Sequence, residues 1–122
     1  MIQPLEIAFH NTRPVPDVET HIRQELAELE KYYNRIVSCR VDVEFPEHPR
    51  RGSVSKVRLE LNVPAQDAVT PARLRGVEIS AHGTERVEVE AEHKNASVAA
   101  HEAFTVARRR LEEFTGRQHP IA

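Results

Sequence analysis

The sequence predicts an α+β sandwich in which two helices cover one face of a mostly antiparallel sheet, in the order β-α-β-β-β-α. Two segments carry apolar residues at helical spacing, and the segments before and between them alternate apolar with polar residues, as half-buried strands do. The chain has 122 residues, of which 39% are hydrophobic and 30% charged. This is enough to build one core without a metal or a disulfide, so we expect a single domain over residues 1–122.

The last helix is predicted over residues 95–114 and organises the rest of the fold. Its apolar residues recur at steps of three and four, and most are alanine: Ala96, Ala100, Ala103, Ala107, Leu111 and Phe114. Asn95 stands where an N-cap belongs, and Gly116 stands where the chain should leave the helix. Because alanine is small, this helix can lie close against a sheet.

The first strand and the first helix come at the start of the chain. Apolar side chains alternate with others at Leu5, Ile7 and Phe9, which predicts a strand that the prolines of residues 12–16 end. We expect Asp17 to cap the following helix and Asn34 and Arg35 to close it. Its apolar stripe consists of Ile22, Leu26, Leu29 and Tyr33.

Two strands follow the first helix and should pair antiparallel, since only a turn at residues 46–53 separates them. The inward residues of the second strand are Val37, Cys39, Val41, Val43 and Phe45. Those of the third strand are Val57, Leu59, Leu61 and Val63.

We interpret residues 64–76 as an exposed insertion. Residues 77–91 are either a short hairpin or contain one strand that joins the main sheet.

Composition limits the possible functions. The net charge is -2, from 17 basic and 19 acidic residues, so a surface for a polyanion would need local segregation of charge. The single cysteine, Cys39, rules out an internal disulfide and suits a reducing compartment. No apolar run approaches the roughly 20 residues of a membrane span, and the N-terminus does not resemble a secretory signal. We therefore expect a cytoplasmic protein with no membrane partner.

Catalytic and metal-binding motifs are hard to find. The seven histidines form no H-E-x-x-H pattern, and no glycine-rich phosphate loop is present. Glu90, Glu92 and His93 could meet a metal, but alternating charges on the wet face of a strand need no function. Cys39 lies among inward valines, which favours a core thiol over a nucleophile. We expect no catalytic residue, metal, cofactor or small-molecule substrate.

Basic residues are the remaining candidates for a binding site. In the last helix Arg109 should point to solvent, Arg108 should lie on a flank, and Arg110 should lie near the edge of the core. Ion pairing with Glu112 and Glu113 is an equally good interpretation of these arginines. Together with cations of the first helix and of outward strand positions, they could form a basic tract that binds phosphates: Lys31, Arg35, Arg40, Lys56, Arg58, Arg108 and Arg109.

Four stretches of the sequence form a pattern of their own. The early strand reads LEIAFHN, a helix ending in LEKYYNRI (29–36) runs directly into the strand VSCRVDVEF, and a later strand reads VRLELNVP. The last helix has the form AAHEAFTVARRRLEEF. These stretches resemble the family of ribosome hibernation-promoting and ribosome-associated inhibitor factors, and the resemblance covers roughly residues 5–63 and 93–117.

The resemblance implies the β-α-β-β-β-α fold, with a shape like a double-stranded-RNA-binding domain. It also implies a non-enzymatic protein that binds the small ribosomal subunit in the mRNA/tRNA channel, inhibits translation and preserves idle ribosomes under stress. Lys31 and Arg35 match basic positions of the family's first helix, and Arg108 and Arg109 fall in the usually basic part of the last one.

The chain also departs from the family pattern. Acidic residues interrupt the last helix, the net charge is not basic, and the chain ends at Ala122, where long forms continue into a dimerisation domain. The short form is therefore expected, with its oligomeric state open. The alternative is a divergent member that acts as a protein-interaction module with weakened RNA binding.

Overall fold

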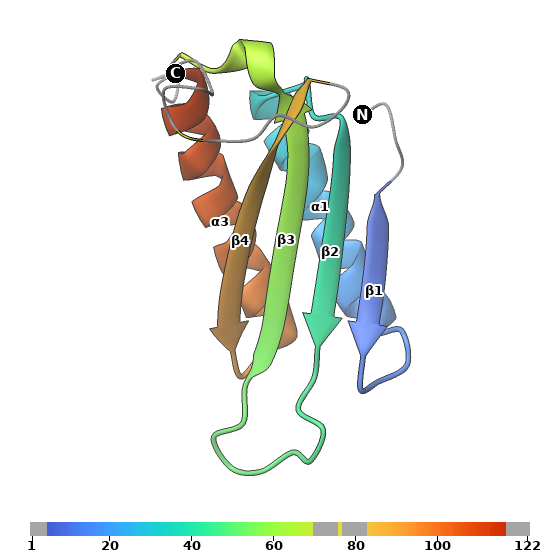
Figure 1. Ribbon diagram of the computed structural model, residues 1–122. Helices are drawn as coiled ribbons and strands as arrows, with labels where there is room; N and C mark the ends of the chain where they lie inside the picture. The colour runs from blue at the N-terminus through green and yellow to red at the C-terminus, as the bar shows by residue number, and fades with distance from the viewer. Residues whose placement is uncertain (1–4, 70–75, 77–82, 117–122) are drawn as a thin grey trace.

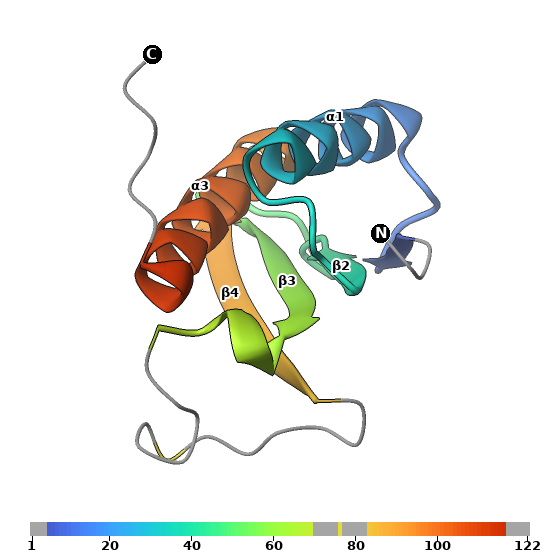
Figure 2. The same ribbon diagram turned by 90° about the horizontal axis from the view of Figure 1, so that it is seen from above.

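The computed structural model describes residues 5–69, 76 and 83–116. These residues form β1 (Glu6–His10), α1 (Pro16–Tyr32), β2 (Ser38–Glu44), β3 (Ser55–Pro64), the 3₁₀ helix η1 (Ala65–Asp67), β4 (Thr84–His93) and α3 (Ala96–Thr115). Both long helices lie on the same side of the sheet, and neither of them covers the opposite side, which we call the open face (Figures 1 and 2). The predicted α+β sandwich and its element order are confirmed.

The sheet has the order β1-β2-β3-β4. β1 and β2 are parallel, and α1 forms the crossover that a parallel pair requires, whereas the other neighbours are antiparallel. The register places Ile7 beside Val41, Val41 beside Leu59, and Leu59 beside Val89. One side of the sheet is therefore apolar from edge to edge, and the helices cover that side.

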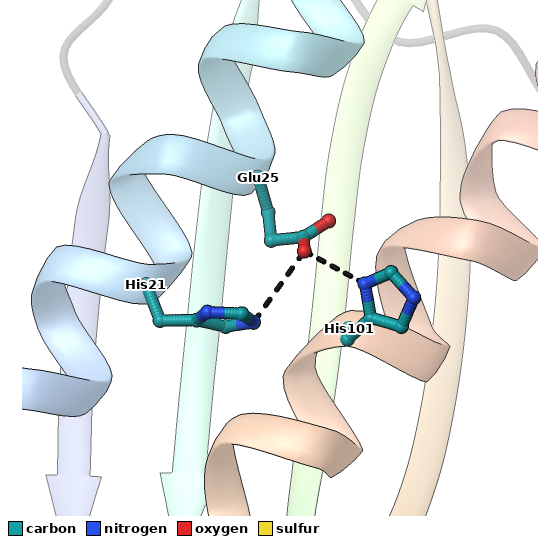
Figure 3. Close-up of side chains that lie close together, drawn as sticks. All are labelled: His21, Glu25 and His101. Carbon is teal, nitrogen blue, oxygen red and sulfur yellow. Dashed lines mark hydrogen bonds and ion pairs between the residues drawn. The ribbon is translucent and has the colours of Figure 1, made fainter.

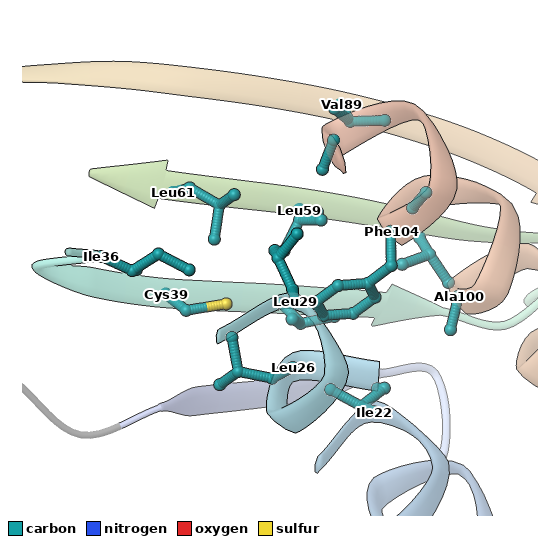
Figure 4. Packing of buried hydrophobic residues seen from close by; sticks show 14 of the residues in the cluster. Ile22, Leu26, Leu29, Ile36, Cys39, Leu59, Leu61, Val89, Ala100 and Phe104 are labelled. Carbon is teal, nitrogen blue, oxygen red and sulfur yellow. The ribbon is translucent and has the colours of Figure 1, made fainter. Parts of the chain in front are cut away.

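The core lies between this apolar face and the two helices (Figure 4). Ile22, Leu26 and Leu29 of α1 are buried as the apolar stripe predicted. The buried face of α3 is wider than its predicted stripe, because Ala99 and Phe104 are also buried. The reason is that α3 contacts β3, β4 and α1 at once, so that more of its circumference faces apolar neighbours.

The ends of α3 are those predicted from the sequence, but the ends of α1 differ from the predicted ones. The Asn95 side chain accepts hydrogen bonds from the backbone N–H groups of Ser97 and Val98, and Gly116 leaves α3 in the left-handed conformation. In α1 the N-cap residue is Val15 and not Asp17. Pro16 suits the first turn because its ring fixes φ and no N–H is left unpaired there. Asp17 instead lies inside the first turn, near the positive end of the helix dipole.

At its C-terminus α1 ends earlier in the sequence than expected. The helix stops at Tyr32, and Tyr33 is already extended, with φ of -139°. Arg35 therefore lies in the connection to β2, and it is not one helical turn beyond Lys31. The tight connection buries Tyr33 and Ile36 in the core.

The segment after β3 begins with regular structure. β3 runs through Pro64, and η1 follows it directly, so an irregular segment starts only at Ala68. The Val69 N–H donates to the Phe114 carbonyl, which ties this segment to the end of α3. Residues 84–93 form one long strand that pairs with β3 along its whole length. Residues 77–82, where the first half of a hairpin would lie, are outside the described residues, as are residues 70–75 of the expected insertion.

Replacing Ala103 by leucine should lower the free energy of unfolding by about 1–3 kcal/mol, because the added methyl groups have no space to enter. Ala103 lies on the buried face of α3, which contacts β3, β4 and α1, and its side chain is fully buried. Urea denaturation followed by circular dichroism measures the change. Ala27 is exposed on α1, so Ala27→Leu provides the matched control and should stay within about 0.5 kcal/mol of the parent. Equal midpoints for the two variants would contradict the tight packing of α3.

Candidate nucleic-acid interface

The open face of the sheet carries three of the predicted cations. Arg40, Lys56 and Arg58 all lie on its outward side, as the alternation of the strands predicted. Within the paired residues of the four strands, this face carries four cations and seven carboxylates. The cations are Arg40, Lys56, Arg58 and Arg86, and the carboxylates are Glu6, Asp42, Glu44, Glu60, Glu88, Glu90 and Glu92. Acidic side chains therefore outnumber basic ones there.

Each of the three predicted cations on this face is paired with carboxylates. Arg40 contacts Glu6 at 3.2 Å and Asp42 at 3.3 Å. Lys56 contacts Glu90 at 3.4 Å, and Arg58 contacts the same carboxylate at 3.6 Å. These hydrogen bonds and charges raise the pKa of Arg40 and of Lys56. A phosphate approaching this face would have to compete with carboxylates that already hold the cations.

Arg35 belongs to a local structural contact. The Asp67 carboxylate accepts a hydrogen bond from the Tyr33 hydroxyl at 2.6 Å and from Arg35 Nε at 2.7 Å. The hydrogen bond and the charge of Asp67 raise the pKa of Arg35. This contact joins the end of α1 to η1, which follows β3. The Arg35 guanidinium is half exposed, and a phosphate that approached it would have to compete with the Asp67 carboxylate.

The remaining predicted cations lie on the helix side, at the C-terminal halves of α1 and α3. The Arg108 guanidinium carbon lies 4.7 Å from the centre of the Tyr32 ring, a cation–π contact. Lys31 precedes Tyr32, is mostly exposed, and contacts Glu28 at 3.1 Å. Arg109 is exposed, and no described residue lies within ion-pair distance of it. We refer to Lys31, Tyr32, Arg108 and Arg109 as the helix-end cluster.

The structure shows ion pairing with a following carboxylate for Arg108, one of the arginines of α3. Arg108 Nε lies 3.9 Å from Glu112, which is a loose ion pair at the expected i, i+4 spacing. Arg110 turns back toward the sheet and donates to the backbone carbonyl of Glu88. The helices and the open sheet face are on opposite sides of the molecule (Figure 2). The predicted tract is therefore divided, with Arg40, Lys56 and Arg58 on the sheet side and Lys31, Arg108 and Arg109 on the helix side. Arg35 lies apart from both groups, in the connection between α1 and β2.

The other candidate groups have structural partners. Glu90 and Glu92 contact Lys56, and His93 Nδ1 accepts a hydrogen bond from the Asn95 N–H. Cys39 is only 2% exposed, which confirms that it is a core thiol. Burial, with a smaller contribution from the Glu30 carboxylate, raises the pKa of Cys39 to about 12.

The folded protein should therefore resist thiol reagents. At about pH 8 the raised pKa leaves a thiolate fraction about a thousandfold smaller than that of an unfolded cysteine. Ellman's reagent should modify Cys39 rapidly in concentrated urea and very slowly in buffer. The unfolded chain serves as its own control, and equal rates in the two solutions would contradict the burial of Cys39.

One cluster was missed by sequence reasoning. His21, Glu25 and His101 lie together between α1 and α3. The i, i+4 spacing of His21 and Glu25 was visible in the sequence, but the third member comes from 76 residues further along than Glu25. Only the packing of the two helices shows this proximity.

Comparison with known protein families identifies the family of this chain. A family model described as sigma 54 modulation protein / S30EA ribosomal protein matches residues 5–119. The chain belongs to this family. The S30EA match spans both helices and all four strands, and it confirms the ribosome-associated family that the sequence resembles. No curated protein is significantly similar in sequence.

Two solved structures are similar to this S30EA member in fold. The N-terminal domain of Protein Y from Thermus thermophilus superposes with a TM-score of 0.63 at 14% identity, over 89% of this chain and 94% of that domain. A ribosomal subunit interface protein from Coxiella burnetii superposes with a TM-score of 0.67 at 7% identity, over 93% of this chain and 98% of that one. Within the described residues, neither helix is long and apolar enough to cross a membrane.

Proposed function

We propose that this protein is a non-enzymatic, cytoplasmic factor that binds the small ribosomal subunit in the mRNA/tRNA channel. By occupying the channel it inhibits translation and preserves idle ribosomes under stress. The observation that carries the proposal is the S30EA family match, which extends over nearly the whole chain. The two structural neighbours, one of which is a ribosomal subunit interface protein, support it.

The helix-end cluster is the surface that we assign to ribosomal RNA. Arg109 is exposed and has no described ion-pair partner. The Arg108 guanidinium stacks on the ring of Tyr32. Lys31, which precedes Tyr32 on α1, adds a third, largely exposed cation. Three cations on the helix side can replace counterions along a phosphate backbone, which is the main source of non-specific affinity for nucleic acids. Arg40, Lys56 and Arg58 face the other way and stay secondary candidates.

The open sheet face favours a second candidate function. Its excess of carboxylates over cations suits a basic protein partner better than RNA. The protein could then act as an interaction module, with the sheet as its contact surface and weak affinity for RNA. The two candidates differ in which face of the molecule binds, so variants on the two faces separate them.

Binding to the ribosome is tested first by sedimentation. Lysate from stationary-phase cells is separated on a sucrose gradient at low salt and probed for the protein. We expect migration with 30S or 70S particles and loss of that migration at high salt. If the protein stays at the top of the gradient at low salt, the proposed ribosome binding is wrong.

The channel is tested with purified components. Small subunits that already carry mRNA and initiator tRNA should bind less of the protein than empty subunits, because the ligands would occupy the same space. Equal binding to loaded and empty subunits would place the protein elsewhere on the ribosome and would contradict the proposed mechanism of inhibition.

A further inference from the structure

We propose that His21, Glu25 and His101 form a binding site for a divalent transition-metal ion of the Zn²⁺ class, which bridges α1 and α3. His21 and Glu25 lie one turn apart on α1, and His101 points toward them from α3 (Figure 3). Glu25 Oε1 lies 3.4 Å from His21 Nε2 and 2.7 Å from His101 Nδ1. Their candidate ligand atoms all lie within 4.8 Å of one another.

This spacing is close to that of a bound metal. Zinc lies about 2.0–2.2 Å from nitrogen and oxygen ligands, so ligand atoms in a tetrahedral site are about 3.3 Å apart. The His21–Glu25 distance of 3.4 Å already fits. The hydrogen-bonded His101–Glu25 pair would open by about 0.6 Å to reach the same spacing. The His101 side chain is 62% exposed, so it has room to rotate for this adjustment.

The surroundings of the His21 side chain favour a role as a metal ligand over a role as a hydrogen-bond partner of Glu25. Its Nε2 atom is shielded from solvent, and no described residue forms a hydrogen bond with it. The Glu25 oxygen faces this atom at 3.4 Å, which is too long for a good hydrogen bond. A shielded imidazole nitrogen without such a partner is unfavourable. A metal ion between His21 Nε2, Glu25 and His101 would satisfy it.

The donor set defines the class of metal. Two imidazoles and one carboxylate suit Zn²⁺, and related ions such as Co²⁺ and Ni²⁺, whereas Mg²⁺ and Ca²⁺ prefer oxygen ligands. The groove between the helices is open above the cluster, where its wall includes Glu28, Thr105 and Arg108. Water from this groove can supply a fourth ligand. The inference does not depend on ribosome binding, since it concerns different residues.

Metal binding would stabilise the packing of the two helices. The ligands come from two elements that meet only in the folded chain, so an ion that binds them stabilises the native state, by an amount that grows with the logarithm of the ion concentration above Kd. Thermal unfolding of the protein should therefore shift to higher temperature as Zn²⁺ is added to chelator-treated protein.

Cobalt provides the direct test, because tetrahedral Co²⁺ absorbs in the visible region. We expect one Co²⁺ ion per chain, with absorption bands that Zn²⁺ abolishes by displacement. His21→Gln, Glu25→Gln and His101→Gln should each weaken Zn²⁺ affinity in calorimetric titration by about tenfold or more. Because His101 is exposed, His101→Gln should fold normally, and circular dichroism checks that each variant does.

The control is another histidine–carboxylate contact among the described residues. His10 Nε2 lies 3.2 Å from Asp42 Oδ1 on the open sheet face. His10→Gln removes a surface histidine of the same kind and should leave both the cobalt spectrum and the Zn²⁺ affinity unchanged. The proposal is overturned if no metal binds below about 1 mM. It is also overturned if His10→Gln weakens binding as much as the three site variants do.

Discussion

Reversing the charges of Arg108 and Arg109 together, to Glu, should weaken binding to the small ribosomal subunit and reduce its dependence on salt. Each phosphate contact contributes about 0.7–0.9 to the slope of log K against log salt concentration. Loss of two contacts should therefore lower that slope by roughly 1.4–1.8. The fold should tolerate the change, because Arg109 is exposed and the stack of Arg108 on Tyr32 is worth only about 0.5–1 kcal/mol.

The measurement is a pull-down of purified 30S subunits over a series of salt concentrations. Lys56→Glu with Arg58→Glu is the matched double variant on the open sheet face, where carboxylates already hold both cations. It should bind like the parent protein. Reversal of Glu112 and Glu113 to Lys should leave binding intact or strengthen it.

The pattern of losses identifies the binding face. If all three double variants bind equally at every salt concentration, the arginines of α3 serve only as solvated surface residues. If the sheet variant alone loses binding, the interface lies on the open face, and the interaction-module candidate gains support. Lys31→Glu should produce a smaller loss than the α3 pair, because it removes a single contact.

Replacing Phe104 by alanine should produce the largest change in stability, a loss of about 3–5 kcal/mol. The ring is 3% exposed and projects from α3 into the core between the helices and the sheet (Figure 4). Its neighbours on the buried face of α3, Ala100, Ala103 and Ala107, are too small to fill the space that it leaves. Urea denaturation gives the difference in free energy of unfolding.

A control for Phe104 lies on the same helix. Val98 is 37% exposed, so Val98→Ala should change the free energy of unfolding by no more than about 0.5 kcal/mol. A loss of less than about 1 kcal/mol for Phe104→Ala would show that the core collapses around the deletion, contrary to close packing.

The strands were the most predictable part of the fold. Their two-residue period assigns each side chain to one face without ambiguity, and Val41, Val43, Leu59 and Leu61 are all fully buried as expected. The helix period is less exact, because the width of the buried stripe depends on how many elements surround the helix. Phe104 was missed for this reason, since α1 packs against α3 on the side that a sheet alone would leave exposed.

The candidate interface was less predictable, because it depends on contacts between distant parts of the chain. The sequence indicated that Arg40, Lys56 and Arg58 point outward. It did not reveal which carboxylates lie opposite them, since that depends on the register between strands. The partnership of Arg35 with Asp67 joins residues 32 positions apart and needs η1, which no sequence pattern predicted. Such pairs decide which cations already have a carboxylate partner.

The hydrogen bond from Arg110 to the backbone carbonyl of Glu88 is made on β4, the last strand of the sheet. Among the described residues, β4 has a neighbour on one side only, so its other edge offers backbone groups to any added strand. Arg110 lies across this edge, and the outward carboxylates Glu88 and Glu90 line the same strand. An incoming strand would have to displace the guanidinium and bring its own backbone beside a row of charge. We therefore expect this arginine, which α3 supplies, to hinder edge-to-edge pairing of β4 with another strand.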